Sequence, residues 1–248
     1  MPLAALEELR PQLRAAGSAA RAKGEKAYLK SDLAFYGTPM ADLRRIASAY
    51  AVAHPDLDRR QLRAIAEAAW KTDHFELRAV ALALLERKKA ALDERDLPWL
   101  LDIVDGSKTW ALVDWLAIEV IGDVVARYPA SLRWLPKWAA QKNFWIRRTA
   151  LLAQHDTLKR GEGDWELFTR LAASMLHEKE FFIRKAIGWV LREVSKKRPK
   201  LVYEFLREHR DEASGLTLRE GAKYLSDAQR RKLGLDPWRD REGKAYGS

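Results

Sequence analysis

Apolar residues along the chain recur at intervals of three and four, which places them on one face of an α-helix. This pattern predicts helices over 41–54, 59–70, 75–92, 95–104 and 164–180. Short segments rich in glycine, proline and charged residues interrupt the pattern at 36–39, 105–108, 161–164 and 196–200. No stretch of five or more residues alternates between apolar and polar as a half-buried strand does. The sequence therefore predicts an all-α fold.

Four of the helical segments share an internal pattern, in which an aromatic residue is followed two positions later by an aliphatic residue. The aromatics are Phe75, Trp110, Phe144 and Phe181, and the aliphatics are Leu77, Leu112, Ile146 and Ile183. The aromatics are 35, 34 and 37 residues apart, a period typical of repeats built from helix pairs. Such repeats stack into a solenoid with a concave surface. We therefore expect one HEAT-like repeat domain over residues 1–236, followed by a loose tail over 237–248, where apolar periodicity is absent.

One position of this repeat is polar although the surrounding helix is apolar. Four residues after each aromatic, the chain has Ala79, Asp114, Arg148 and Lys185. Equivalent positions of stacked repeats form a line, so the three polar residues are predicted to line the concave surface. Trp110 lies one turn before Asp114 and Trp189 one turn after Lys185. The alternative is a structural ion pair made by Asp114, with both tryptophans in the core.

The charge balance favours a polyanionic partner. Lys and Arg number 45 against 35 Asp and Glu, which gives a net charge of +10 and points most often to nucleic acid. A basic protein with a solvated surface is the alternative. The chain has no cysteine, and its five histidines lack metal-site spacing, so we predict neither a metal nor a cofactor. No apolar run is long enough for a membrane span, and the first residues lack a signal sequence. We expect a monomeric protein of the cytoplasm, located at the nucleoid if the organism is a bacterium.

Several segments resemble the AlkD-like family of DNA alkylation-repair glycosylases. The similar segments are 35–47, 74–86, 109–117, 143–154 and 179–193, in the order in which the family has them. The resemblance implies a single domain of HEAT-like repeats that binds duplex DNA in its concave face. It also implies hydrolysis of the N-glycosidic bond of N3- and N7-alkylated purines.

The family's functional residues match four positions of this sequence. Its catalytic aspartate matches Asp114, and its two tryptophans match Trp110 and Trp189. Its active-site arginine falls within residues 145–148, where the repeat register favours Arg148 because that residue is level with Asp114. Arg147 remains open, since it aligns with Arg78 and Arg184, where a repeated arginine could be structural.

The chemistry of an alkylated purine fits this set of residues. A purine alkylated at N3 or N7 is cationic and leaves as a neutral base, so it needs no general acid, whereas sugar hydrolysis employs two carboxylates. One carboxylate can stabilise the developing oxocarbenium ion and orient water, while tryptophan faces attract the cationic nucleotide. We expect catalytic roles for Asp114, Trp110, Arg148 and Trp189, and DNA binding by Lys185, Arg147, Lys196, Lys197 and Arg198. A non-enzymatic helical-repeat module, binding DNA or protein through the same face, is the competing hypothesis.

Overall fold

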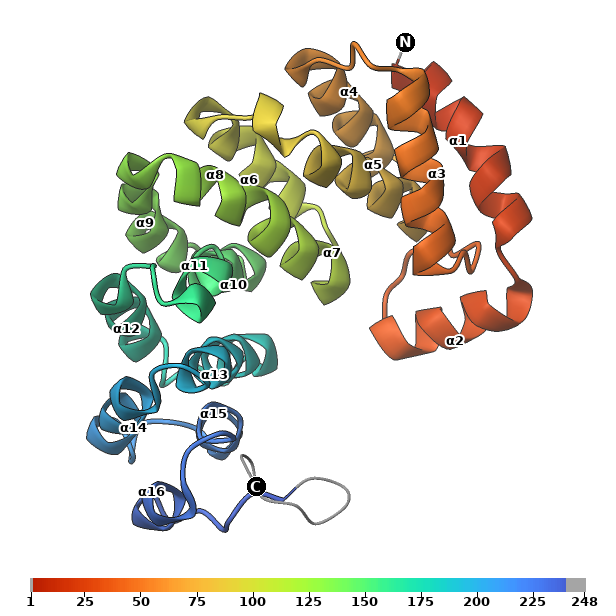
Figure 1. Cartoon of the computed structure of the whole chain (residues 1–248). Helices are drawn as coiled ribbons and strands as arrows, with labels where there is room; N and C mark the ends of the chain where they lie inside the picture. The colour runs from red at the N-terminus through yellow and green to blue at the C-terminus, as the bar shows by residue number, and fades with distance from the viewer. Residues whose placement is uncertain (1, 240–248) are drawn as a thin grey trace. The chain divides into compact units, whose positions relative to one another are not determined.

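The structure is a computed structural model and describes residues 2–239. It confirms the predicted all-α class, because helices make up its architecture (Figure 1) and the described residues contain only an isolated β-bridge, between Ala34 and His74. The chain forms two compact units, Met1–Tyr128 and Pro129–Ser248. The expectation of one domain over 1–236 stays a prediction. Part of the expected tail, residues 240–248, lies outside the described residues. Arg239, which belongs to the described part of that tail, forms an ion pair with the Asp227 carboxylate at 2.8 Å.

The first unit is built around helix α5. Its elements are α1 (Pro2–Ala16), α2 (Ala19–Leu29), α3 (Met40–Ala53), α4 (Arg59–Trp70), α5 (Phe75–Arg87), the 3₁₀ turns η1 (Lys89–Ala91) and η2 (Glu94–Asp96), α6 (Leu97–Asp105), α7 (Trp110–Trp115), the π-helical segment η3 (Leu116–Ile121) and α8 (Gly122–Arg127). Residues 75–85 of α5 are all buried, since α1, α3, α4 and α7 pack around it. The helix predicted over 75–92 therefore ends earlier, and the chain continues as a 3₁₀ turn.

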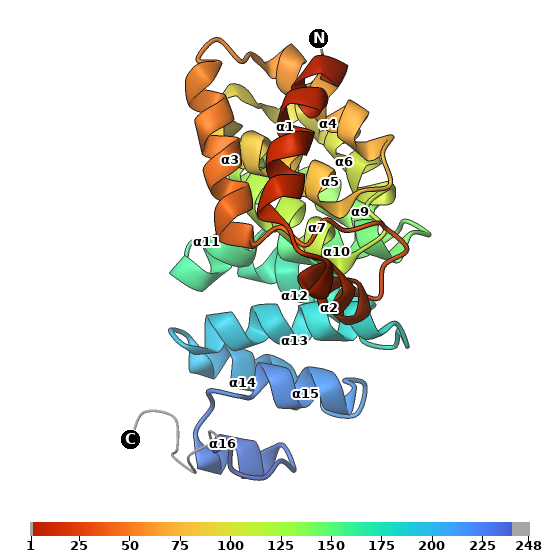
Figure 2. The same ribbon diagram turned by 90° about the vertical axis from the view of Figure 1, so that its right-hand side faces the viewer.

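The second unit is built around helix α13. Its elements are η4 (Pro129–Trp134), α9 (Leu135–Ala139), α10 (Phe144–Leu152), α11 (His155–Arg160), α12 (Trp165–Ser174), α13 (Phe181–Ser195), α14 (Pro199–Glu208), α15 (Gly215–Gly221) and α16 (Asp227–Lys232). Helix α13 packs against α10, α11, α14 and α15, and Figure 2 shows α15 beside it. Gly188 permits this close approach, because a Cβ there would lie 2.6 Å from the Cβ of Glu220.

The four aromatics that the sequence singled out all begin helices. Phe75, Trp110, Phe144 and Phe181 are the first residues of α5, α7, α10 and α13. The aliphatic residue two positions later is buried in every case. The repeated aromatic therefore marks the start of the second helix of each pair.

A repeated arginine explains how these helices are joined to the preceding ones. Arg78 donates hydrogen bonds to the carbonyls of Trp70, Thr72 and Gly106. Arg184 donates to the carbonyl of Glu178 in the same way. Carbonyls at and beyond a helix end lack intrahelical donors, and each guanidinium binds the carbonyl six residues before it, in the turn that precedes its own helix. The arginine at this register position is structural.

Candidate active site

Asp114 lies in a helix that is irregular directly after it. Thr109 precedes the helix in extended conformation, Trp110 is its first residue, and Asp114 follows one turn later. The chain remains helical through η3 and α8, but in η3 the bonding becomes π-helical, and the Gly122 N–H donates to the Ala117 carbonyl. π-Helical turns are rare and occur frequently at functional sites. The sequence predicted a helical segment that begins at Trp110, and its pattern does not indicate this irregularity.

The surroundings of Asp114 on its own helix are apolar. Only 8% of its surface is exposed, and Leu112, Val113, Leu116 and Ala117 are fully buried. Burying a carboxylate costs free energy unless specific interactions compensate it. Asp114 is buried like Glu76 and Asp96 of the same unit, and among these acids it is the one that the sequence predicted to be catalytic.

Tyr28 is an aromatic residue that the sequence analysis missed. It lies on α2 with 72% of its surface exposed, and its ring meets the Trp110 ring edge-on, with centroids 5.7 Å apart and planes at 79°. The same helix carries the exposed lysines Lys23 and Lys26. Exposed aromatics among cations are typical of surfaces that bind nucleic acids. No motif in the sequence singles out Tyr28, because its contact with Trp110, the first residue of α7, arises from tertiary packing.

Glu76 fixes the loop that follows α2. Its buried carboxylate accepts hydrogen bonds from the backbone N–H groups of Tyr36 at 3.0 Å, Gly37 at 2.6 Å and Thr38 at 3.3 Å. Gly37 has φ +75°, and a Cβ there would lie 2.3 Å from the Ser18 carbonyl oxygen, so this loop requires glycine. These contacts join α5 to the loop between α2 and α3.

In the second unit, the two adjacent arginines make different contacts. Arg147 donates to both carboxylate oxygens of Glu178, at 2.9 and 2.7 Å, and to the carbonyls of Gln141 and Lys142, at 2.8 and 2.7 Å. It thus occupies the structural register position that it shares with Arg78. These contacts favour Arg148 as the functional arginine of the pair.

Arg148 is held against the start of α13. Its guanidinium donates to the Phe182 carbonyl and lies 5.8 Å from the centre of the Phe182 ring. Phe182 also contacts the rings of Phe144 and Trp145, with centroids 6.2 and 4.8 Å apart. Only 2% of the Arg148 surface is exposed. The phosphate contact expected for Arg148 stays a prediction.

Two of the lysines expected to bind DNA are paired with carboxylates. Lys185 Nζ lies 2.6 Å from Glu220 Oε1, and Lys196 Nζ lies 2.7 Å from Glu193 Oε2. Arg192 joins the two pairs, at 2.6 Å from Glu220 Oε2 and 3.4 Å from Glu193 Oε1. These five residues form a charge network along α13 and α15. Glu220 was not singled out in the sequence, since it lies 35 residues from Lys185 and in no motif.

The remaining candidates lie around the other helices of the second unit. Lys197 is exposed, with Nζ 3.4 Å from the Arg160 carbonyl, and Arg198 donates to the Leu158 carbonyl at 2.9 Å. Trp189 is half-buried on α13, and its ring packs against the ring of His155, with centroids 4.8 Å apart. His155 was not predicted to take part in the site.

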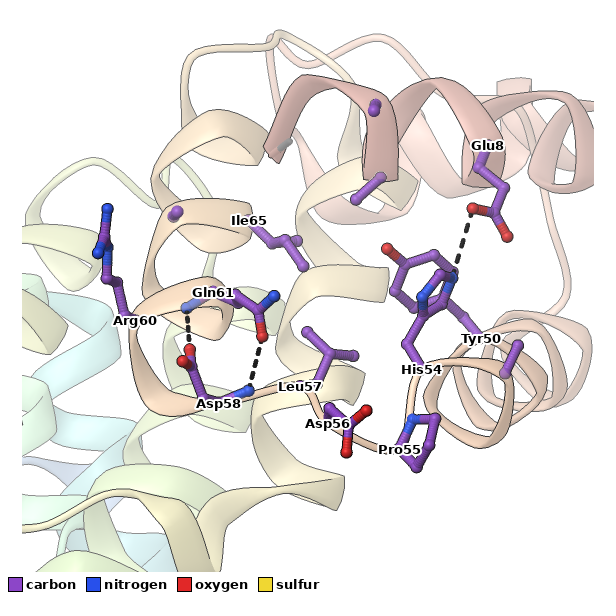
Figure 3. A pocket seen from close by; sticks show the side chains of 14 residues that line it. Glu8, Tyr50, His54, Pro55, Asp56, Leu57, Asp58, Arg60, Gln61 and Ile65 are labelled. Atoms are coloured by element: carbon purple, nitrogen blue, oxygen red, sulfur yellow. Dashed lines mark hydrogen bonds and ion pairs between the residues drawn. The ribbon is translucent and has the colours of Figure 1, made fainter.

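A pocket of about 740 Å³ lies elsewhere in the first unit, between α1, α3 and α4 (Figure 3). Tyr50, His54 and Gln61 line it, and His54 Nε2 lies 3.5 Å from Glu8 Oε2. None of the residues predicted to act on DNA lines this pocket. Over residues 2–239 no helix is long and apolar enough to cross a membrane, and no cluster of three or more His, Asp or Glu residues suits a metal ion.

Comparisons with known proteins identify the family and the fold. A family model described as DNA alkylation repair enzyme matches residues 9–225. A solved structure described as a predicted DNA alkylation repair enzyme from Enterococcus faecalis is 27% identical, with a TM-score of 0.77 over 85% of this chain and 97% of that chain. AlkD2 from Streptococcus mutans shares the fold at 19% identity, with a TM-score of 0.60 over 82% of this chain and 99% of that one. Curated protein sequences give no match. The match over most of its length shows that the chain belongs to the DNA alkylation repair enzyme family.

Proposed function

We propose that this protein is a DNA glycosylase that hydrolyses the N-glycosidic bond of cationic N3- and N7-alkylated purines in duplex DNA. The observation that carries the proposal is Asp114, a buried carboxylate one turn after Trp110 and directly before a π-helical segment. Family membership supports a role in alkylation repair. The buried carboxylate supports the chemistry.

One carboxylate is enough for this reaction. The alkylated purine carries a positive charge and leaves as a neutral base, so no residue has to protonate it. Positive charge instead develops on the deoxyribose, and Asp114 stabilises that charge and orients the attacking water. The apolar neighbours of Asp114 strengthen the effect, because a charge acts more strongly where water is excluded.

The aromatic and basic residues would bind the DNA. Trp110 and Tyr28 offer two rings at 79° to one another, and Trp189 offers a third ring from the second unit. Such rings attract a cationic nucleotide by about 0.5–2 kcal/mol each. We expect Lys185 and Lys197 to neutralise phosphates, with Arg148 as a further candidate, and each phosphate neutralised makes binding more salt-dependent.

The experiment is base release from a duplex that contains N7-methylguanine. The wild type should release free methylpurine and leave an abasic site, whereas Asp114→Asn should release almost none. Asp102→Asn is the matched control, because Asp102 is an exposed acid on α6 of the same unit, and it should keep the wild-type rate. If the wild type binds DNA and releases no methylpurine, the non-enzymatic binding module becomes the better account.

A further inference from the structure

His155 lies beneath Trp189 in the second unit and has no part in the function proposed so far. It is the first residue of α11, and only 6% of its surface is exposed. Its ring centroid lies 4.8 Å from that of Trp189, with the planes inclined at 58°. Trp189 itself is half-buried on α13, so one part of the indole is open to solvent while His155 supports another.

The imidazole ring is fixed in one orientation by its neighbour. Nδ1 lies 2.8 Å from Asp156 Oδ1, and Nε2 is buried with no hydrogen-bond partner among the described residues. This arrangement suits a neutral imidazole that donates from Nδ1, because a second N–H on Nε2 would be buried without an acceptor. Burial lowers the pKa of His155, against the opposing effect of Asp156. The ring is therefore an uncharged support at neutral pH.

We propose that His155 is a positioning residue for Trp189, and that its ring, oriented by Asp156, holds the indole in the orientation that the substrate requires. The proposal rests on the proposed role of Trp189 at the alkylated nucleotide. A half-exposed tryptophan can change rotamer, whereas an aromatic ring packed against it restricts that freedom. The stabilisation that an aromatic pair of this kind provides corresponds to a change of about 3- to 10-fold in an equilibrium constant or a rate constant, so loss of the pair should be measurable.

The charges facing His155 determine what protonation does. Asp156 and Glu193 favour the imidazolium, whereas Lys159 and burial disfavour it. Glu193 lies on α13 and is already paired with Lys196. When His155 takes up a proton below its lowered pKa, a cation appears against the indole, and that cation competes with a cationic nucleotide for the same π-system. The contribution of Trp189 should therefore weaken as the pH falls.

Nuclear magnetic resonance tests the contact without relying on catalysis. The indole N–H signal of Trp189, assigned by its absence in Trp189→Phe, should shift between pH 8 and 4.5 with a midpoint below 6.5. In His155→Asn the midpoint should vanish. Asparagine places its amide near the position of Nδ1 and so keeps the donor to Asp156 while removing the ring. An indole signal that titrates alike in both proteins would overturn the proposal.

A double-mutant cycle tests the positioning role. His155→Asn should lower the single-turnover rate of base release about 3- to 10-fold, and it should have no further effect in a Trp189→Ala background. His155→Phe keeps a ring against the indole and should lose less activity, which separates support from general unfolding. Additive losses in the cycle would show that His155 acts independently of Trp189. If the wild type released no base at all, the proposed function would fail, and the indole titration would still decide whether His155 positions Trp189.

Discussion

Replacing Glu220 by glutamine should strengthen the dependence of DNA binding on salt. Glu220 holds Lys185 at 2.6 Å and Arg192 at 2.6 Å, and Glu193 holds Lys196 at 2.7 Å. The network has three cations and two carboxylates, so one positive charge is uncompensated. Glu220→Gln raises that excess to two, which makes one further cation available to a phosphate.

The size of the effect follows from counterion release. Each additional phosphate neutralised steepens the plot of log affinity against log salt by about 0.9. Between 50 and 200 mM salt the variant should therefore lose about 3.5-fold more affinity than the wild type. The two ion pairs are partly exposed, so the substitution should lower the free energy of unfolding by only about 1–2 kcal/mol. Fluorescence anisotropy with an undamaged duplex at several salt concentrations measures the slope.

Glu204→Gln is the control for net charge. It changes the charge of the protein by the same amount, but Glu204 is only loosely paired with Lys200, at 4.0 Å. The slope for this variant should stay close to that of the wild type. Equal steepening in both variants, or none in Glu220→Gln, would refute the assignment of this network to phosphate binding.

Three further predictions concern the residues around the candidate site. Arg147→Met should lower the free energy of unfolding by about 3 kcal/mol, because it leaves Glu178 without this ion pair. The excision rate of the folded fraction should stay unchanged. Arg148→Ala should instead weaken affinity for damaged and undamaged duplex alike. Glu76→Gln should lower the free energy of unfolding, measured by urea denaturation, by about 2–4 kcal/mol. It should also speed amide exchange at Tyr36, Gly37 and Thr38, whose N–H groups donate hydrogen bonds to the carboxylate. Because the pKa of His155 is lowered on folding, the unfolded chain binds the proton first as the pH falls below about 6.5, so stability should decrease from there down to the folded pKa. His155→Phe should abolish that decrease in denaturation curves measured across this range.

The positions of the helices could be predicted because each depends on local pattern. Phe75, Trp110, Phe144 and Phe181 begin helices as the repeat indicated. Alignment of Arg147 with Arg78 also raised the structural role that the hydrogen bonds now favour. A repeat register carries such information because equivalent residues meet equivalent surroundings.

The contacts around the candidate residues could not be predicted in this way. The π-helical segment over Leu116–Ile121 has the same apolar composition as an α-helix, so nothing in its spacing indicates the change in hydrogen bonding. Tyr28 and Glu220 act through residues 82 and 35 positions away, at Trp110 and Lys185. Pairings over such separations arise from tertiary packing, which a single sequence without a motif does not specify.

The central claim is that Asp114 acts on the sugar during bond cleavage and does not bind DNA. The most direct test is the single-turnover excision rate of Asp114→Asn at saturating N7-methylguanine duplex, measured beside its affinity for the same duplex. The rate should fall by at least about 100-fold, while the affinity stays equal or improves slightly, because a negative charge near phosphates has been removed. Loss of affinity and rate in equal proportion, together with a lower free energy of unfolding, would contradict the claim and make Asp114 a structural residue.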